Sequence, residues 1–261
     1  MTIKLIDDKA RIEDFLLKTR GVYCYHLGDL DDFFWPHTEW TALEDRGEIK
    51  ALNLIYCGPG LPVLLAVENG NLPEMRVLLA GMLPALPERF YAHLSPGLEE
   101  ILAAACALQD HGEHYKMLLT SPDLLANGEP NQARRVQADD LPELQALYAA
   151  GYPGNWFDPR MIETGQYFGI WQGGRLVSAA GVHVYSAAYR IAALGNITTH
   201  PGHRRQGLGR QVTAALCRSL LHTVDLVGLN VKADNTAAIY TYQKLGFTIL
   251  ASYHEYTVNK L

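Results

Sequence analysis

A strand-like run that leads through a polar loop into a long amphipathic helix constrains the fold of this chain most. Residues 190–199 are mostly apolar, and the loop over 200–209 is polar and contains glycine. The helical pattern then covers 208–223 and gives the helix one apolar face. Its apolar positions are Val212, Leu216, Leu220 and Leu221. This order places the start of a helix at the end of a strand, where a ligand can meet the N–H groups of the first helical turn.

The loop at the start of this helix has the features of an anion site. The N–H groups of a first helical turn lack partners, and the helix dipole is positive there. Gly207 and Gly209 let the backbone approach a ligand closely. Between Arg190 and Val224 the chain has arginines but neither Asp nor Glu, although its net charge is -6. We therefore expect a ligand that carries phosphate; the alternative is a solvated basic helix start.

Other phosphate-binding patterns do not fit this loop. A P-loop has the pattern G-x-x-x-x-G-K-[ST], and a Rossmann fingerprint has the pattern G-x-G-x-x-G; residues 197–212 match neither pattern, because Val212 stands where the third Rossmann glycine would be. Nucleotide hydrolysis and nicotinamide binding are therefore disfavoured. His200 and His203 lack further ligands nearby in the sequence, so we expect no metal site.

Composition limits the remaining classes of protein. The chain has 261 residues, of which 48% are hydrophobic and 19% charged. This suits one large globular domain or two small ones and argues against disorder. Because the net charge is -6, we expect no general binding to nucleic acid.

The cysteines and the N-terminal segment indicate the compartment. Cys24, Cys57, Cys106 and Cys217 form no C-x-x-C pair, so neither a disulfide framework nor a zinc site is expected, and a reducing, intracellular setting fits. Residues 1–17 are charged rather than signal-like. No apolar run approaches the roughly 20 residues of a membrane-spanning helix. We expect a cytoplasmic protein with no membrane association.

A polar segment divides the chain into two predicted domains. Residues 121–132 contain two prolines and a glycine, which is typical of a linker. We expect a smaller N-terminal α/β domain over 1–127 and a second domain over 128–261. In the first domain the patterns predict helices over 6–18, 72–83 and 95–108 and strands over 49–56, 62–68, 89–94 and 115–120. In the second they predict strands over 134–137, 167–172, 176–185, 190–199, 226–231 and 247–258 and helices over 141–150, 208–223 and 235–245.

Two motifs in the second domain resemble those of the GNAT superfamily of CoA-dependent N-acyltransferases. Residues 204–209 have the sequence RRQGLG and match the pattern R/Q-x-x-G-x-G/A. Residues 235–247 resemble the pattern N-x-x-A-x-x-x-Y-x-K-L-G-F. The resemblance covers about residues 133–261. It implies an α/β (α+β) fold with a mixed, mostly antiparallel sheet flanked by helices, and acetyl-CoA as the cosubstrate.

The resemblance also implies roles for individual residues. The end of the central strand, Ile197, Thr198 and Thr199, would pair with the pantetheine arm. The loop and helix start would wrap the pyrophosphate through Arg205, Gln206, Gly207, Leu208, Gly209 and Arg210. Asn235 would contact the CoA moiety. Tyr242 would place its hydroxyl near the thioester sulfur.

The implied chemistry is direct transfer of the acyl group to an amine. Backbone N–H groups near Thr198 and Thr199 could hold the developing negative charge. A phenol with a pKa of about 10 is suited to protonate a leaving thiolate with a pKa of about 8.5. The alternative for Tyr242 is a packed helix tyrosine with a satisfied hydroxyl. Tyr240 competes with it, but its spacing from the motif residues does not match.

The catalytic base stays open. Some family members carry an acidic residue where this chain has Asn230, and an amide cannot accept a proton at neutral pH. Glu163, His183, His200 or a water chain are the alternatives. We choose none of them, because each is more often a surface or a satisfied polar residue.

A group of aromatic residues before the first hairpin has two interpretations. In the family the corresponding region shapes the acceptor pocket, whereas a hydrophobic core is the simpler role. The group consists of Tyr152, Trp156, Phe157 and Tyr167.

The first domain has no phosphate loop, yet its order of elements resembles a shortened copy of the second. One hypothesis is a degenerate GNAT-like domain that has lost cofactor binding; the other is an unrelated α/β domain. Two roles are open for it: covering one side of the acceptor site, or forming a homodimer.

The resemblance makes an N-acetyltransferase that acts on a small-molecule or peptide amine the leading function. One alternative is a regulatory protein that binds acyl-CoA without turnover, which the amide at Asn230 favours. The other is acyl transfer to an alcohol.

Overall fold

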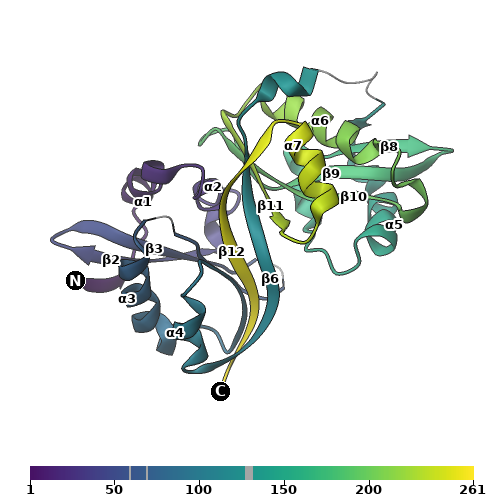
Figure 1. The fold of residues 1–261 in the computed structure, drawn as a ribbon. Coiled ribbons are helices and arrows are strands. Elements are labelled where there is room, and N and C mark those ends of the chain that lie inside the picture. The colour runs from purple at the N-terminus through teal and green to yellow at the C-terminus, as the bar shows by residue number, and fades with distance from the viewer. Residues whose placement is uncertain (59, 69, 127–131) are drawn as a thin grey trace. The chain divides into compact units, whose positions relative to one another are not determined.

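The computed structural model describes residues 1–58, 60–68, 70–126 and 132–261 (Figure 1). They form two compact units that interleave along the chain. Unit 1 consists of Met1–Lys116, Val231–Asp234 and Ile249–Leu261, and unit 2 of Met117–Asn230 and Asn235–Thr248. The predicted boundary between residues 127 and 128 lies outside the described residues. The interleaving arises because three strands, β6, β11 and β12, contribute residues to both units.

Unit 1 is built on a mixed sheet. Its strands are β1 (Thr2–Leu5), β2 (Thr38–Asp45), β3 (Glu48–Tyr56), β4 (Val63–Ala66), β5 (Arg89–Leu94), β6 (Cys106–Leu119) and β12 (Phe247–Lys260), in the order β1-β2-β3-β4-β5-β12-β6. Neighbours from β1 to β4 are antiparallel, β4 and β5 are parallel, and β5 and β12 are antiparallel.

The described residues of unit 1 form four α-helices, and one of them covers the core. They are α1 (Lys9–Leu16), α2 (Cys24–Gly28), α3 (Leu72–Met82) and α4 (Glu99–Ala103). Helix α3 packs against β2 and β3, and its apolar side chains join those of the strands in one buried cluster that includes Leu78, Phe90 and Val258.

Unit 2 contains the loop and helix singled out by the sequence. Its strands run in the order β11-β10-β9-β8-β7, with bounds β7 (Arg134–Arg135), β8 (Phe168–Gln172), β9 (Arg175–Ser186), β10 (Ile191–Thr199) and β11 (Leu226–Lys232). All neighbours are antiparallel except β10 and β11, which are parallel.

The helices of unit 2 are α5 (Leu141–Gly151), α6 (Leu208–Leu220) and α7 (Thr236–Lys244). Helix α6 packs against β8, β9 and β10, and α5 packs against β9 and β10. Three of the four predicted apolar positions of α6 are confirmed, because Val212, Leu216 and Leu220 are fully buried; the fourth, Leu221, is exposed and follows the end of the helix. The expected mixed, mostly antiparallel sheet flanked by helices is therefore confirmed.

The two units repeat one pattern. In each, antiparallel strands lead to a helix and then to a parallel strand: β1 to β4, α3 and β5 in unit 1, and β7 to β10, α6 and β11 in unit 2. The two units differ in how far the first strand of the parallel pair continues beyond the paired residues. Strand β4 pairs with β5 over its whole length, whereas β10 pairs with β11 only over Ile191–Leu194 and continues to Thr199.

One predicted helix is wrong. Residues 95–108 contain only the short helix α4, and β6 begins at Cys106. Ser95, the first residue of the predicted helix, instead uses its hydroxyl to accept a hydrogen bond from the Glu68 N–H at 2.8 Å and to donate one to the Glu68 carbonyl at 3.1 Å. The alanines at 103–105 favour helix locally, but strand pairing takes over directly after them.

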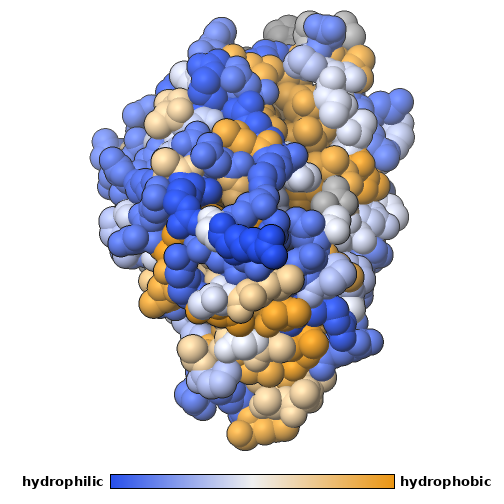
Figure 2. Space-filling model, turned by 90° about the vertical axis from the view of Figure 1, so that its left-hand side faces the viewer, coloured by the Kyte–Doolittle hydropathy of each residue, from blue (hydrophilic) through white to orange (hydrophobic). Residues whose placement is uncertain are grey.

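Among the described residues, no helix is long and apolar enough to cross a membrane. On the face shown in Figure 2, hydrophilic residues cover much of the surface, and hydrophobic residues appear in patches between them.

Candidate functional site

The end of β10 leaves one backbone edge without a strand partner. Its register with β9 shifts between Gly195 and Thr198, and Asn196 has a φ of 54°, so the strand bulges there. On the other side, no described residue of β11 pairs with β10 beyond Leu194. The backbone of Ile197–Thr199 thus has no strand partner on that side among the described residues and could pair with an extended ligand, although the Thr199 carbonyl already accepts from the Arg204 guanidinium at 3.3 Å.

The loop after β10 ends in an unusual backbone conformation. Arg205 has a φ of 62°, and Gly207, the N-cap of α6, has a φ of 76°. Both lie in the left-handed region, where a residue other than glycine is strained. No side chain of the described residues caps α6, so the N–H groups of its first turn are available for an anion.

The predicted phosphate-loop residues differ in exposure. Arg205, Gln206, Gly207 and Arg210 are exposed and Gly209 is half-buried, but the Leu208 side chain is buried. Leu208 can therefore contribute only its backbone N–H. The preceding Arg204 turns away from the helix start: its guanidinium donates to the Thr199 carbonyl at 3.3 Å and to the Gly151 carbonyl at 3.2 Å.

The two histidines of the loop have local partners. His200 Nδ1 accepts from the Gly202 N–H at 3.2 Å, and His203 Nδ1 lies 2.9 Å from Gln172 Oε1. In the described part of the chain, no group of three His, Cys, Asp or Glu side chains is placed to hold a metal ion.

Helix α7 carries the two downstream motif residues. Asn235 Oδ1 accepts from the Ala238 N–H at 3.2 Å and caps the helix, so its oxygen has a structural role. Tyr242 is 8% exposed, and burial, together with Tyr152 and Cys217 nearby, raises its pKa. No hydrogen bond joins its hydroxyl to another described residue. The phenol is therefore neutral at physiological pH and retains a proton that it can donate.

The three alternatives for the base lie in different surroundings. Glu163 is exposed in the turn Pro159–Thr164, and His200 lies in the loop. Only His183 is close to the bulge, because a side chain at Gly195 would overlap its ring. The Asn230 oxygen is buried without a hydrogen-bond partner among the described residues. Strand β10 itself contains no Asp or Glu residue.

The four aromatic residues before the hairpin divide into two pairs. Phe157 packs on Tyr148 at 5.1 Å and on Tyr167 at 5.9 Å between ring centres, and Tyr167 is fully buried, so this pair belongs to the core. Trp156 packs on His183 at 5.7 Å, and Tyr152 is exposed. Only this second pair is available to shape an acceptor pocket.

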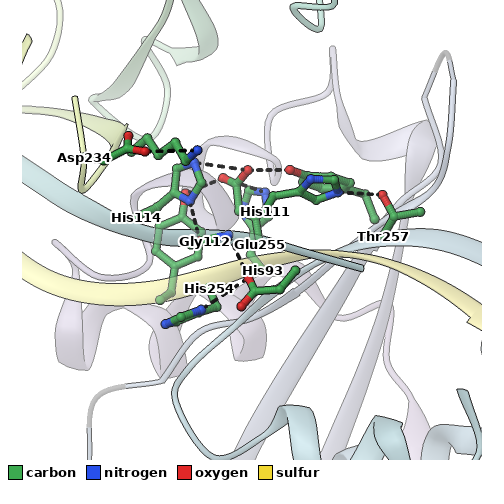
Figure 3. Close-up of polar contacts among 12 residues, drawn as sticks. His93, His111, Gly112, His114, Asp234, His254, Glu255 and Thr257 are labelled. Atoms are coloured by element: carbon green, nitrogen blue, oxygen red, sulfur yellow. Dashed lines mark hydrogen bonds and ion pairs between the residues drawn. The ribbon is translucent and has the colours of Figure 1, made fainter. Parts of the chain in front are cut away.

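Unit 1 contains a polar cluster that the sequence analysis missed (Figure 3). The Glu255 cluster consists of Glu255, Tyr91, His93, His114 and Tyr253. The tyrosine hydroxyls donate to the carboxylate at 2.6 and 2.8 Å, and the imidazole Nε2 atoms lie 3.4 and 3.5 Å from it. Burial alone would raise the pKa of Glu255, but the histidines and the tyrosine hydroxyls together lower it. The carboxylate is therefore ionised.

A buried lysine lies beside this cluster. Lys116 is 4% exposed, and its ammonium lies 5.0 Å from the centre of the Tyr25 ring and 5.3 Å from that of Tyr253. Burial lowers its pKa to about 8. The runs over 111–116 and 253–257 contain no Val, Ile, Leu or Met, and this lack of aliphatic residues is the signal that could have identified a polar sheet face.

We expect Glu255→Gln to lower the free energy of unfolding by about 1–3 kcal/mol at pH 7, because the amide presents a donor to one of two tyrosine donors. The lowered pKa means that the carboxylate contributes fully above its ordinary value of 4.5 and loses this contribution as the pH falls through the folded-state value. The difference between wild type and variant should therefore shrink in acid. Urea unfolding at pH 7 and pH 3.5 measures it. Exposed Glu88→Gln is the control, and a difference that grows in acid would contradict the assignment.

Comparison with known sequences points to one family. Residues 133–247 match the Acetyltransferase (GNAT) family. The [Ribosomal protein bS18]-alanine N-acetyltransferase of Escherichia coli is 30% identical over 135 residues, which cover 49% of this chain and 89% of that protein. The mycothiol acetyltransferase of Catenulispora acidiphila is 36% identical over 99 residues, which cover 36% of this chain and 30% of that protein. The match thus spans less than a third of the second relative.

The solved structures extend the fold similarity to the whole chain. A tandem GNAT protein from the clavulanic acid biosynthesis pathway matches with a TM-score of 0.59 and 16% identity, over 99% of this chain and 98% of that one. At this identity the similarity concerns the fold alone.

Proposed function

Since the chain belongs to the GNAT acetyltransferase family, we propose that unit 2 transfers an acetyl group from acetyl-CoA directly to an amine. One observation carries this proposal. The unpaired backbone edge of Ile197–Thr199 and the uncapped start of α6 lie at the two ends of a single loop. An extended thioester arm and a pyrophosphate, joined in one ligand, would suit these two features.

The cosubstrate would be held mainly by backbone groups. The pantetheine arm would pair with Ile197–Thr199, and the N–H groups of residues 207–210 would surround the pyrophosphate at the positive end of the helix dipole. The exposed guanidinium groups of Arg205 and Arg210 would add charge. Asn235 would contact CoA through its amide nitrogen, because its oxygen caps α7.

In the reaction, the nitrogen of a neutral amine attacks the thioester carbonyl and the C–S bond breaks. Backbone N–H groups near Thr198 and Thr199 stabilise the negative charge on the carbonyl oxygen. Tyr242 donates its proton to the leaving thiolate, for which its raised pKa keeps it protonated. The amide product forms when the nitrogen loses its extra proton to solvent or to a base.

The acceptor in this proposal is a primary amine on a small molecule or a peptide. Both kinds occur in the names of the similar proteins, mycothiol in one and a ribosomal-protein alanine in the other. We further propose that the protein acts in the cytoplasm, since all four cysteines are free thiols.

For unit 1 we propose a degenerate GNAT-like domain without a cofactor. The end of its parallel strand pair is closed: the Ser95 N–H donates to the Ala66 carbonyl at 3.1 Å, the Ser95 hydroxyl joins both backbone groups of Glu68, and Tyr23 donates to the Glu68 carboxylate at 2.7 Å. A pantetheine arm would have to break these bonds. Forming a homodimer is the role that we propose for this unit.

A second candidate is a sensor that binds acyl-CoA without turnover. Asn230 favours it, because its amide oxygen is buried with no hydrogen-bond partner in the part of the chain that the structure describes and an amide cannot serve as a base. Tyr242 argues against it, since a sensor needs no proton donor.

The test of this function has two steps. Calorimetric titration with acetyl-CoA should give one equivalent per chain, because only unit 2 has an open strand end. A panel of primary amines should then give steady, acetyl-CoA-dependent release of free thiol. Binding without release from any amine would favour the sensor, two equivalents would contradict the closed site of unit 1, and absence of binding would contradict both functions.

A further inference from the structure

We infer that Asn196 is a positioning residue for acyl transfer, because it sets the geometry of the β10 bulge. Asn155, on the loop after α5, acts on the bulge through its hydrogen bond to the Asn196 side chain. This inference rests on the proposed function of unit 2. Neither residue belongs to the motifs that identify the phosphate loop.

The backbone of Asn196 creates the bulge. Its φ of 54° lies in the left-handed region, which asparagine tolerates better than other residues with a Cβ atom. The register with β9 shifts directly after Gly195, and β10 leaves β11 just before it. The residues proposed to hold the thioester, Ile197–Thr199, follow at once, so this conformation sets the direction of their N–H groups.

The side chain of Asn196 is held on both sides. It is 3% exposed; its Nδ2 donates to the Tyr167 hydroxyl at 3.1 Å, and its Oδ1 accepts from Asn155 Nδ2 at 3.0 Å. The Tyr167 hydroxyl donates onward to the Val182 carbonyl at 3.1 Å. This chain of bonds leaves one orientation for the amide.

A third bond holds the main chain of the bulge. The Tyr148 hydroxyl, on α5, donates to the Asn196 carbonyl at 3.2 Å. Burial raises the pKa of both Tyr148 and Tyr167, so both remain donors at neutral pH. The bulge is therefore fixed by elements outside β10, and not by strand pairing alone.

Asn155 connects this hydrogen-bond network to the loop that is proposed to contact the amine acceptor. The next residue, Trp156, packs on His183, whose ring covers Gly195. One hydrogen bond thus joins the loop proposed to contact the acceptor to the strand proposed to hold the donor. A loop displaced by the loss of this bond would release the bulge and misplace the thioester carbonyl.

Two variants separate the side-chain network from the backbone conformation. Asn196→Gly keeps the left-handed conformation but removes the side chain, and Asn155→Ala removes only the loop bond. We expect each to lower kcat about 10-fold, since small displacements of a reacting group have effects of this size, with KM for acetyl-CoA within about 2-fold of wild type. Asn259→Ala, an exposed asparagine of unit 1, is the control and should leave kcat unchanged.

A second readout does not depend on turnover. Amide hydrogen exchange at His200, whose N–H donates to the Val177 carbonyl of β9 at 2.8 Å directly after the bulged segment, should be faster in both variants than in wild type, at equal global stability. Unchanged exchange, or a raised KM with unchanged kcat, would overturn the inference. If wild type shows no turnover with any amine, the proposed function fails, and the exchange rates alone decide the role of Asn196 in the bulge.

Discussion

The Gly207→Glu variant should show no thermal stabilisation by acetyl-CoA. In wild type, ligand at about 100 times its dissociation constant stabilises the folded state by roughly 2.7 kcal/mol, which raises the melting temperature by several degrees. The substitution acts in two ways. Gly207 has a φ of 76°, which a side chain strains, and the new carboxylate would stand where the pyrophosphate is proposed to bind.

The control for this variant matches both its backbone and its charge. Gly47 is an exposed glycine of unit 1 with a φ of 85°, so Gly47→Glu adds the same strain and the same charge away from the loop. It should retain the full rise in melting temperature with acetyl-CoA. A full rise in Gly207→Glu as well would show that the phosphate groups bind elsewhere.

The Tyr242→Phe variant should lose about 100-fold in kcat, which is the usual contribution of a positioned general acid. The phenyl ring retains the packing against Phe247, at 6.0 Å between ring centres, so stability and KM for acetyl-CoA should change little. Tyr240→Phe, an exposed tyrosine in the same helix, should keep wild-type kcat. Steady-state rates with one active amine measure both variants.

The pH dependence gives an independent check on Tyr242. Burial raises its pKa above the ordinary value of 10.0, so the phenol keeps its proton throughout the neutral and mildly alkaline range. The ratio of wild-type to variant kcat should therefore stay constant up to pH 10. A ratio that falls toward one near neutrality would contradict the role of this hydroxyl as proton donor.

The second half of the chain was predictable because its signals are local. Most of the apolar face of α6, the strands β9 to β11 and the helix α7 each depend on residues close together in the sequence, and the structure confirms them. The strands β1 and β2 in the first half have no comparable pattern. The helix expected over 95–108 is wrong because pairing in the sheet outweighs the helix propensity of its alanines.

The functional sites also differ in whether nearby residues in the sequence could predict them. The phosphate loop could be proposed from residues 204–209 alone, because a glycine-containing turn before a helix carries its own geometry. The Glu255 cluster joins Tyr91 and His114 to a carboxylate more than a hundred residues later. No local pattern reports such a pairing. The partners of Asn196 are likewise distant in sequence.

By itself, then, the sequence indicated the family through two motifs that resemble those of the GNAT superfamily. It also determined the loop that is proposed to bind phosphate and the helix that follows it, since short-range backbone geometry and apolar periodicity specify these. Only the tertiary structure decided which strands complete unit 1, where its parallel pair is closed by Ser95, and how Asn196 is held. These depend on hydrogen bonds between segments far apart in the chain, and such bonds form only once the strands have paired and excluded water from their partners.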